Sequence, residues 1–131
     1  MTIERLQERI SDFAKAFLQL EKAAAMPHDE FIRDSLIQRF EFTYELAWKM
    51  LKLRLELDFI DAKTPRQVFQ DALQAGFISD GNAWSELHKQ RNLTSHTYDE
   101  VMAEQVYAYV VECGLMLFRE LAQVSAGWRS V

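Results

Sequence analysis

Apolar residues recur at intervals of three and four positions along most of this chain, and this spacing constrains the fold more than any other feature. In the first segment, these residues are Ile3, Leu6, Ile10, Phe13, Phe17, Leu20 and Ala24, which form one apolar stripe on a helix. Only four glycines and two prolines occur in 131 residues, and both prolines lie outside the periodic stretches. Because a turn-rich β fold needs more of both, we predict an all-α protein.

Capping residues mark where the next helices begin and end. Pro27 breaks the chain after the first helix, and Asp29 can cap a second helix that runs to about Leu57. In Thr64-Pro65-Arg66-Gln67 a capping threonine precedes a proline at the first helical position, and Gln67 can complete a capping box. We expect this third helix to be short and to end at Gly76.

Two further helices complete the expected fold. One runs from about Ala83 to Asn92, and Thr97-Tyr98-Asp99-Glu100 repeats the capping-box pattern where the last one begins. The expected buried face of the last helix consists of Met102, Val106, Tyr109, Val110, Cys113, Met116, Leu117 and Leu121. We therefore predict an antiparallel four-helix up-and-down bundle with a short additional helix, forming one domain over residues 1–131 whose tail after about residue 126 frays.

The second helix is unusual because it carries two apolar stripes. The first stripe consists of Leu36, Phe40, Tyr44, Ala47, Leu51 and Leu55. The second consists of Phe42, Leu46, Met50 and Leu53, with Trp48 nearby. The pattern fits a helix that contacts something outside its own bundle, and it fits equally a central helix packed on several sides. Tyr44 and Trp48 could stack on a base, although aromatic residues at helical spacing usually belong to the core.

Charge and cysteine content limit the class of protein. The net charge of −5 argues against broad, non-specific binding of nucleic acid, although a local basic site could still bind RNA and a basic partner could be attracted. A lone cysteine, Cys113, fits a buried thiol in a reducing cytoplasm. The start of the chain is charged and resembles no signal peptide, and no uninterrupted apolar run is long enough for a membrane span. We expect a cytoplasmic protein without a membrane partner.

Several kinds of site are excluded by the motifs that the sequence lacks. It has no glycine-rich phosphate loop, no cysteine cluster for zinc, and no serine or cysteine triad. The three histidines, His28, His88 and His96, form neither a metalloprotease pair nor a Glu-x-x-His di-iron motif. We therefore expect neither a cofactor nor a metal.

The segment from Lys89 to Tyr98 is the remaining candidate for chemistry. On one continuous helix Arg91 and His96 would diverge, but the polar residues between them favour caps and turns. We expect the helix to end near Asn92, so that Arg91, His96 and Tyr98 gather at one end of the bundle. Tyr98 is expected in the first turn of the next helix.

This set of side chains suits metal-independent RNA cleavage. Histidine can take the proton of a ribose 2′-hydroxyl as it attacks the adjacent phosphate, and arginine can bind the charge of the transition state. One histidine serves only one of the two reacting oxygens, whereas two copies across a two-fold axis would serve both. Arg91 and His96 are thus candidate catalytic residues of a homodimer, with Lys89 and Asn92 as candidates for positioning the substrate.

The simpler interpretation is a polar corner between helices. An Arg-x4-His pair is expected about 0.2 times by chance in such a chain, and with tyrosine two residues later about 0.006 times. Lys89 and His88 could extend a phosphate-binding patch or could simply be solvated. Asp99 and Glu100 suit a helix N-terminus, so a capping role is sufficient for both.

At this segment the sequence resembles the HEPN family. The R-x4-H-x-Y form of its toxin branch is matched by Arg91-Asn92-Leu93-Thr94-Ser95-His96-Thr97-Tyr98. The stretch from Ile37 to Lys49 resembles the second-helix signature of nucleotidyltransferase substrate-binding proteins. With the order and length of the helices, the resemblance covers nearly the whole chain.

The resemblance implies a toxin–antitoxin module. The HEPN protein would be a homodimeric ribonuclease, with higher assembly left open, and would cut RNA such as tRNA or mRNA. A minimal nucleotidyltransferase would act as the antitoxin by transferring AMP to Tyr98, which places a bulky anion beside Arg91. An alternative implied by the same family is a non-catalytic subunit that binds a substrate or nucleotide for the nucleotidyltransferase.

Overall fold

The computed structural model describes residues 2–130, so Met1 and Val131, the two ends of the expected domain, lie outside the described residues. The helices are α1 (Thr2–Ala25), α2 (Glu30–Leu57), α3 (Pro65–Gln74), α4 (Gly81–Leu93), α5 (Glu100–Tyr109) and α6 (Leu115–Ala126). A π turn, Val110–Gly114, joins α5 and α6 into one continuous helix, and a 3-10 turn, Thr94–His96, follows α4. Within residues 2–130 there is no strand, which confirms the all-α prediction.

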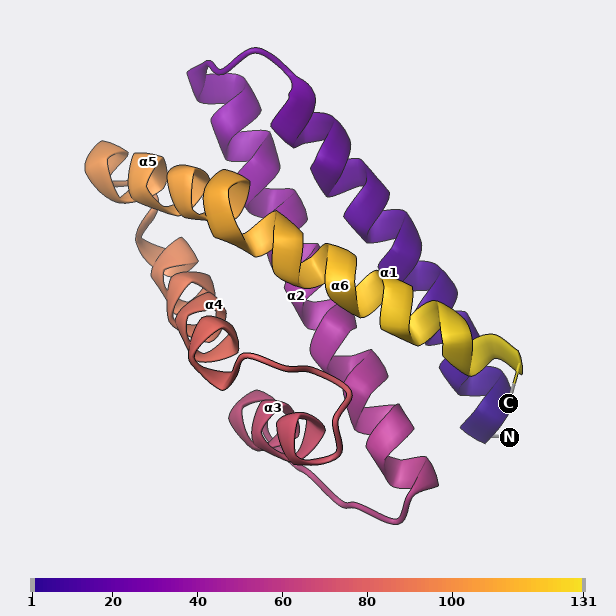
Figure 1. Cartoon of the computed structure of the whole chain (residues 1–131). Helices are drawn as coiled ribbons and strands as arrows, with labels where there is room; N and C mark the ends of the chain where they lie inside the picture. Colours follow the sequence, from indigo (N-terminus) through magenta and orange to yellow (C-terminus); the bar gives the residue numbers. More distant parts are fainter. Residues whose placement is uncertain (1, 131) are drawn as a thin grey trace.

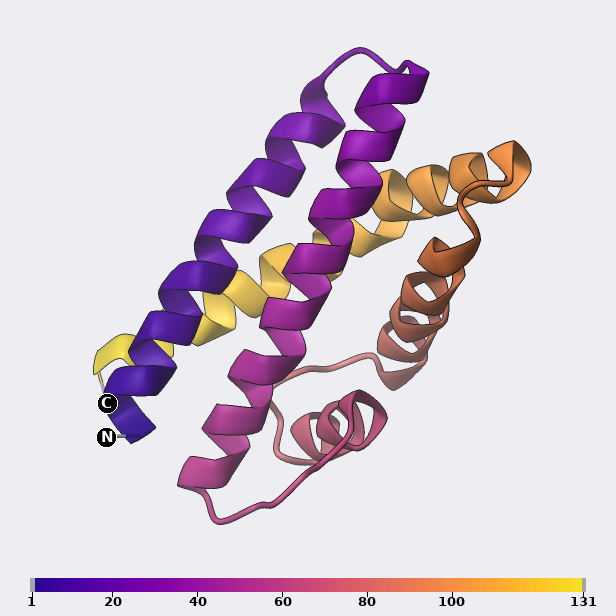
Figure 2. The same ribbon diagram turned by 180° about the vertical axis from the view of Figure 1, so that it is seen from behind.

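The long helices form two layers. Helices α1 and α2 are an antiparallel pair, and the continuous α5–α6 helix crosses one face of this pair obliquely (Figures 1 and 2). The short helix α3 lies near the C-terminal end of α2, and α4 connects this region to the start of α5 (Figure 1). The end of α4 and the start of α5 therefore lie at the opposite end of the molecule from the two chain termini.

The caps explain where most of these helices begin. Asp29 and Thr64 accept hydrogen bonds from the backbone amides three residues later, as predicted. Asp80 caps α4 through the Ala83 amide, so this helix starts two residues earlier than expected. Helix α5 is capped by Asp99, whose carboxylate accepts from two amides, and the prediction of a cap at Thr97 is therefore wrong. Consequently Tyr98 precedes this helix instead of standing in its first turn.

The core is formed by one connected set of apolar side chains from all the helices. Every residue of the first α2 stripe is buried, including Tyr44. Of the second stripe, Met50 is buried and Leu46, Leu53 and Trp48 are partly buried against the core, so the interpretation of α2 as a central helix accounts for them. Phe42 is the exception, because it is 56% exposed.

The π turn changes which residues of the last helix face the interior. Val106, Val110, Leu117 and Leu121 are buried as expected. Cys113 and Met116 are exposed, so the prediction of a buried thiol is wrong. A π turn holds one residue more than an α-helical turn, and here Gly114 takes the interior position that a regular period assigned to Cys113.

The C-terminal segment also differs from its expected frayed state. Gly127–Ser130 forms a 3-10 turn, and Trp128 is only 9% exposed. Its ring packs edge-on against Phe77, and the Arg54 guanidinium lies over both rings. Aromatic stacking and a cation–π contact thus hold the tail on the core.

The continuous helix Glu100–Ala126 is long and apolar enough to cross a membrane by length and composition, with a mean hydropathy of 1.3 over its most apolar window. The sequence expectation of no membrane span considered only uninterrupted apolar runs and did not single out this segment. A helix that packs into the core of a globular protein satisfies the same criterion, and Val106, Val110, Phe118 and Leu121 of this helix are buried among the other helices. This single helix is therefore weak evidence for a membrane span.

Candidate functional site at the α4–α5 junction

The junction after α4 is built by hydroxyl side chains that bond to backbone carbonyls. Thr94 donates to the Arg91 carbonyl at 2.7 Å, Ser95 to that of Asn92 at 3.0 Å, and Thr97 to that of Thr94 at 3.1 Å. The last carbonyls of a helix have no partner within it, and these hydroxyls satisfy several of them. The threonine and serine residues of the motif thus end α4 and form the 3-10 turn that carries His96.

Arg91 lies in the last turn of α4, and its guanidinium points toward α2. Its Nη1 donates to the buried Thr94 hydroxyl at 2.9 Å. Two α2 carboxylates lie slightly farther away, with Glu41 3.8 Å from Nη1 and Glu45 3.7 Å from Nη2. The guanidinium carbon is 5.8 Å from the centre of the Tyr44 ring. Because it is held on several sides, this cation has a defined orientation.

His96 and Tyr98 lie at the same end of the molecule but face solvent. The His96 side chain is exposed, and Tyr98 is 86% exposed. Their rings meet edge-on with centroids 6.2 Å apart. Within residues 2–130, no hydrogen bond or ion pair joins Arg91 to His96. The structure therefore places the three predicted residues on one short junction, with Arg91 packed and the other two free to meet another molecule.

A buried arginine fixes the helix that follows the junction. Arg33 of α2 is 5% exposed and donates to Asp34, to Glu104 at 3.1 Å and to Glu100 at 3.3 Å. The hydrogen bond to Asp34 raises the pKa of Arg33 against the opposing effect of burial, and the bonds to Glu104 and Glu100 add to the rise. Glu100 therefore does more than favour the helix N-terminus, because it also ties the first turn of α5 to α2.

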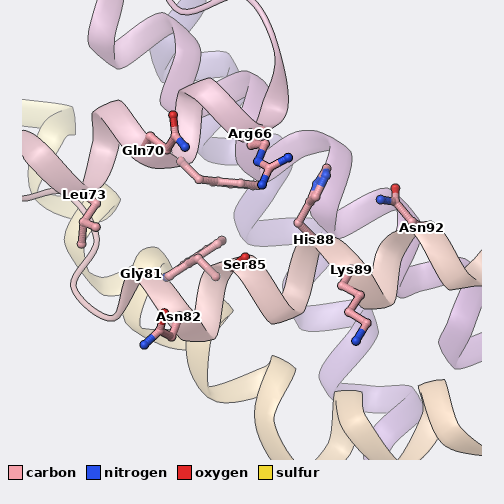
Figure 3. Close-up of a pocket in the computed structure, with 11 residues that line it drawn as sticks. Arg66, Gln70, Leu73, Gly81, Asn82, Ser85, His88, Lys89 and Asn92 are labelled. Atoms are coloured by element: carbon pink, nitrogen blue, oxygen red, sulfur yellow. The ribbon is translucent and has the colours of Figure 1, made fainter.

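Lys89 and Asn92, the candidates for positioning substrate, both line a cleft between α3 and α4. Asn92 lies on the side of α4 that faces Arg66, whereas the Lys89 side chain points away from Arg66 (Figure 3). His88 lines the same cleft, and its Nδ1 lies 2.6 Å from the hydroxyl of the buried Tyr44. Burial and the charges of Arg66 and Arg91 lower the pKa of His88. Tyr44 thus belongs to the core and touches both Arg91 and His88, whereas Trp48 donates a hydrogen bond to Glu45.

Several of these contacts were not predicted from the sequence. Glu41 and Glu45 are four residues apart in the α2 signature, so both carboxylates fall on one helix face, which is the signal that could have found them. Arg33 and Arg66 carried no such signal. Each gains its role from a helix that is distant in the sequence.

Comparison with known proteins identifies relatives of this chain. The sequence model of the family described as "Nucleotidyltransferase substrate binding protein like" matches residues 8–125. The protein "Probable ribonuclease HepT" of Haemophilus influenzae is 34% identical over 127 aligned positions, covering 84% of this chain and 86% of that relative.

Two solved structures share the fold. A protein of Thermus thermophilus superposes with a TM-score of 0.74 at 28% identity, covering 88% of this chain and 96% of that one. A protein of Haemophilus influenzae, described as revealing the fold of a substrate binding domain of a nucleotidyltransferase, superposes with a TM-score of 0.68 at 28% identity and covers 95% of this chain and 98% of its own. The likeness thus extends over nearly all of the helices, and the chain belongs to the nucleotidyltransferase substrate-binding protein family and is a homologue of the probable ribonuclease HepT.

Proposed function

We propose that this protein is a metal-independent endoribonuclease toxin of the HEPN type that acts as a homodimer in the cytoplasm. The observation that carries the proposal is the asymmetry of the junction, where Arg91 is oriented by α2 while His96 projects into solvent. An oriented guanidinium suits the binding of phosphate charge, and an exposed imidazole suits proton transfer with a molecule outside the chain. Homology to a probable ribonuclease supports the same reaction class.

The reaction proceeds by attack of a ribose 2′-oxygen on the neighbouring phosphorus. The new P–O2′ bond forms as the P–O5′ bond breaks, which gives a cyclic phosphate and a free 5′-hydroxyl. One imidazole takes the proton from the 2′-hydroxyl, and a second supplies a proton to the departing 5′-oxygen. Because each chain offers one His96 at the junction, the second imidazole comes from the partner chain.

Tyr98 is the proposed acceptor of AMP from a minimal nucleotidyltransferase antitoxin. Its hydroxyl oxygen would attack the α-phosphate of ATP and release pyrophosphate. The 86% exposure of this side chain leaves it open to another enzyme's active site. The attached AMP would place an anion and a nucleoside next to His96, whose ring is 6.2 Å away, and would compete with RNA for the junction.

The ribonuclease proposal is tested by incubating the purified protein with total tRNA and with mRNA transcripts in the presence of EDTA. We expect wild type to cut at least one of these RNAs and His96→Ala to lose cutting by about 100-fold or more. Ser95→Ala, a change at an exposed neighbour in the same turn, is the matched control and should retain activity. Equal cutting by wild type and His96→Ala would exclude His96 as the catalytic base.

The AMP proposal needs a separate measurement. With ATP, Mg²⁺ and the partner nucleotidyltransferase, intact-protein mass should rise by one AMP or more, and the label should map to Tyr98. Tyr107 is the matched control because it is half-buried against His28, so Tyr107→Phe should still be labelled. Label that persists in Tyr98→Phe would assign the acceptor elsewhere.

One observation favours a second function, that of a non-catalytic subunit that binds substrate for a nucleotidyltransferase. Glu41 and Glu45 lie within 4 Å of Arg91 and would compete with an RNA phosphate for its charge. In that case wild type would cut no RNA, yet it would still bind the nucleotidyltransferase. The EDTA assay together with a pull-down of that enzyme separates the two functions.

A further inference from the structure

The cleft between α3 and α4 has the dimensions and polar groups of a ligand site. Its volume is about 540 Å³, within the usual range for small-molecule pockets. It opens between the two helices, with Arg66 and Gln70 on the α3 side and His88 and Asn92 on the α4 side (Figure 3). Buried Phe69 and Trp84 form its floor and stack on each other, so this floor is rigid.

The charge of this cleft is opposite to that of the whole protein. Arg66 and Lys89 are exposed cations, and no aspartate or glutamate lines the cleft within the described residues. A second cleft, of about 410 Å³, lies between α4 and the α5–α6 helix and is lined by Asp80, Glu86, Glu112 and Glu120. The two clefts beside α4 therefore carry opposite charge, with cations lining one and acids lining the other. An anion should therefore enter the α3–α4 cleft and be repelled by the second one.

His88 contributes a neutral donor to this cleft. Burial raises the pKa of Tyr44 to about 12, so its hydroxyl keeps its proton and can donate it to Nδ1 of His88. The lowered pKa of His88 favours the neutral imidazole. With Nδ1 as acceptor, the ring proton lies on Nε2. His88 can then donate a hydrogen bond to an oxygen of a ligand.

The remaining polar groups of the cleft are neutral and can both donate and accept. Gln70, Asn82 and Asn92 are amides, and Ser85 is a hydroxyl. Amides recognise the edges of nucleobases, which present donors and acceptors side by side, whereas cations recognise phosphates. A ligand that combines both features is a nucleotide.

We propose that the α3–α4 cleft binds one nucleotide of the RNA strand next to the bond that is cut. Arg66 contacts its phosphate, Lys89, which points away from Arg66, contacts the next phosphate of the strand, and the amides contact its base. The cleft reaches the C-terminal end of α4, because Asn92 lines it and directly follows Arg91. Tyr44 connects the two places as well, since its hydroxyl bonds to His88 and its ring faces Arg91. This inference rests on the proposed ribonuclease function for the identity of the ligand.

Binding is best measured in the His96→Ala background, where the RNA stays intact. The probe is a fluorescein-labelled single-stranded RNA of mixed sequence, followed by anisotropy over a range of salt concentrations. We expect Arg66→Gln with Lys89→Gln to weaken binding at least tenfold. Neutralising two phosphate contacts should also lower the slope of log K against log salt by about 1.4, since each contact with a single strand contributes about 0.7.

The matched control removes the same charge from a distant face. Lys15→Gln with Arg119→Gln lies on α1 and α6 and should change binding less than twofold. Equal weakening in both double variants would show a general charge effect and would overturn the proposal. Displacement of the RNA by equimolar free AMP would also overturn it, because the cleft would then be a mononucleotide site. Melting temperatures of both variants should match that of the parent, since the side chains concerned are exposed.

The outcomes separate this inference from the ribonuclease proposal. If wild type fails to cut RNA, but Arg66→Gln with Lys89→Gln loses RNA binding and the control variant does not, the cleft proposal is correct and the catalytic proposal is wrong. If wild type cuts RNA and the cleft variant binds and cuts as the control does, the cleft proposal is wrong. In wild type, Arg66→Gln should raise KM and leave kcat within about twofold, because the residue contributes to binding alone.

Discussion

The two ends of the R-x4-H-x-Y segment differ sharply in how they are held. Arg91 packs against α2, bonds to Thr94 and faces two carboxylates, with its side chain only 26% exposed. His96 and Tyr98, at the other end, face solvent and touch each other edge-on. The same short segment thus combines a fixed cation with two groups that remain accessible.

This difference suits two separate roles in the proposed reaction, stabilisation of charge and transfer of protons. Stabilising transition-state charge requires a donor that is already in place, because reorganisation during the reaction lowers its effect. Proton transfer and modification require groups that other molecules can reach. In the proposed ribonuclease, a single chain would complete the arginine half of the site, whereas the histidine half would need a substrate and a second chain.

The largest expected effect comes from removing Arg91, the fixed cation of the segment. Arg91→Ala should lower the rate of RNA cutting by about 100- to 1000-fold, a typical cost of losing one donor to a transition-state oxyanion. Arg91→Lys should restore little of this rate, since lysine lacks the planar fork that bonds to a phosphate with two N–H groups. Arg119→Ala, which removes an exposed arginine of α6, is the control and should retain the rate. Retention of a third or more of the rate in Arg91→Ala would place the phosphate-binding cation elsewhere.

A smaller effect is expected when Arg33, which holds the start of α5 beside His96 and Tyr98, is replaced. Arg33→Met should lower the free energy of unfolding by about 1–3 kcal/mol, measured by urea titration. The loss stays below the usual cost of breaking a buried ion pair because the three carboxylates that Arg33 leaves can be rehydrated. The amides of Val101 and Met102 should also exchange hydrogen faster. Unchanged stability would show that the other contacts of α5 are sufficient to hold it, and Arg119→Met is the control for loss of a surface arginine.

Thr94→Val tests how firmly Arg91 is oriented. The substitution keeps the shape of the side chain and removes a hydroxyl that bonds to both the guanidinium and the carbonyl of Arg91. We expect the free energy of unfolding to fall by about 1 kcal/mol and the cutting rate to fall less than in Arg91→Ala. Ser95→Ala, which removes the exposed neighbouring hydroxyl, should change stability by less than about 0.5 kcal/mol. If both variants behave alike, Thr94 does not position Arg91.

The smallest effect is a pH dependence of stability from His88. Its folded pKa is lower than the unfolded value of 6.5, so above that value both states are neutral and the full stability is present. As the pH falls below 6.5 the unfolded chain binds the proton first, and stability decreases toward the folded pKa. The melting temperature of wild type should therefore fall more steeply between pH 7 and 5.5 than that of His88→Gln. A steeper fall in the variant would mean that the fold favours the charged imidazole.

Much of the fold could be predicted because the signals are local. Asp29 and Thr64 cap their helices through amides three residues away, which the sequence alone specifies. The predicted cap at Thr97 was wrong although the pattern is also local, because Thr97 and Asp99 are both capping residues. The Thr97 hydroxyl is instead used by the preceding turn, where it bonds to the Thr94 carbonyl, and this leaves Asp99 to cap α5.

The site could be predicted only in part, because some of its contacts join helices that are distant in the sequence. The order Arg91, His96, Tyr98 is a sequence pattern. Their position at one junction could also be predicted, because the polar residues between them favour the end of a helix. The contacts of Arg91 with Glu41 and Glu45 depend on how α2 lies against α4, which no local signal specifies. The α3–α4 cleft likewise arises from the packing of two short helices, and of its cations only Lys89 was a candidate.

The π turn in the last helix has a consequence for how relatives of this chain should be aligned. A π turn contains one residue more than the α-helical turn it replaces, so a relative that lacks it would be one residue shorter between Val110 and Gly114. The gap would fall inside a continuous helix, where alignments normally avoid gaps and shift them into the nearest loop. Such a shift would align α5 one residue out of register with the relative. The motif residues next to α5, His96 and Tyr98, would then be misaligned as well. Anchoring alignments separately on α5 and α6 would keep His96 and Tyr98 matched to their counterparts.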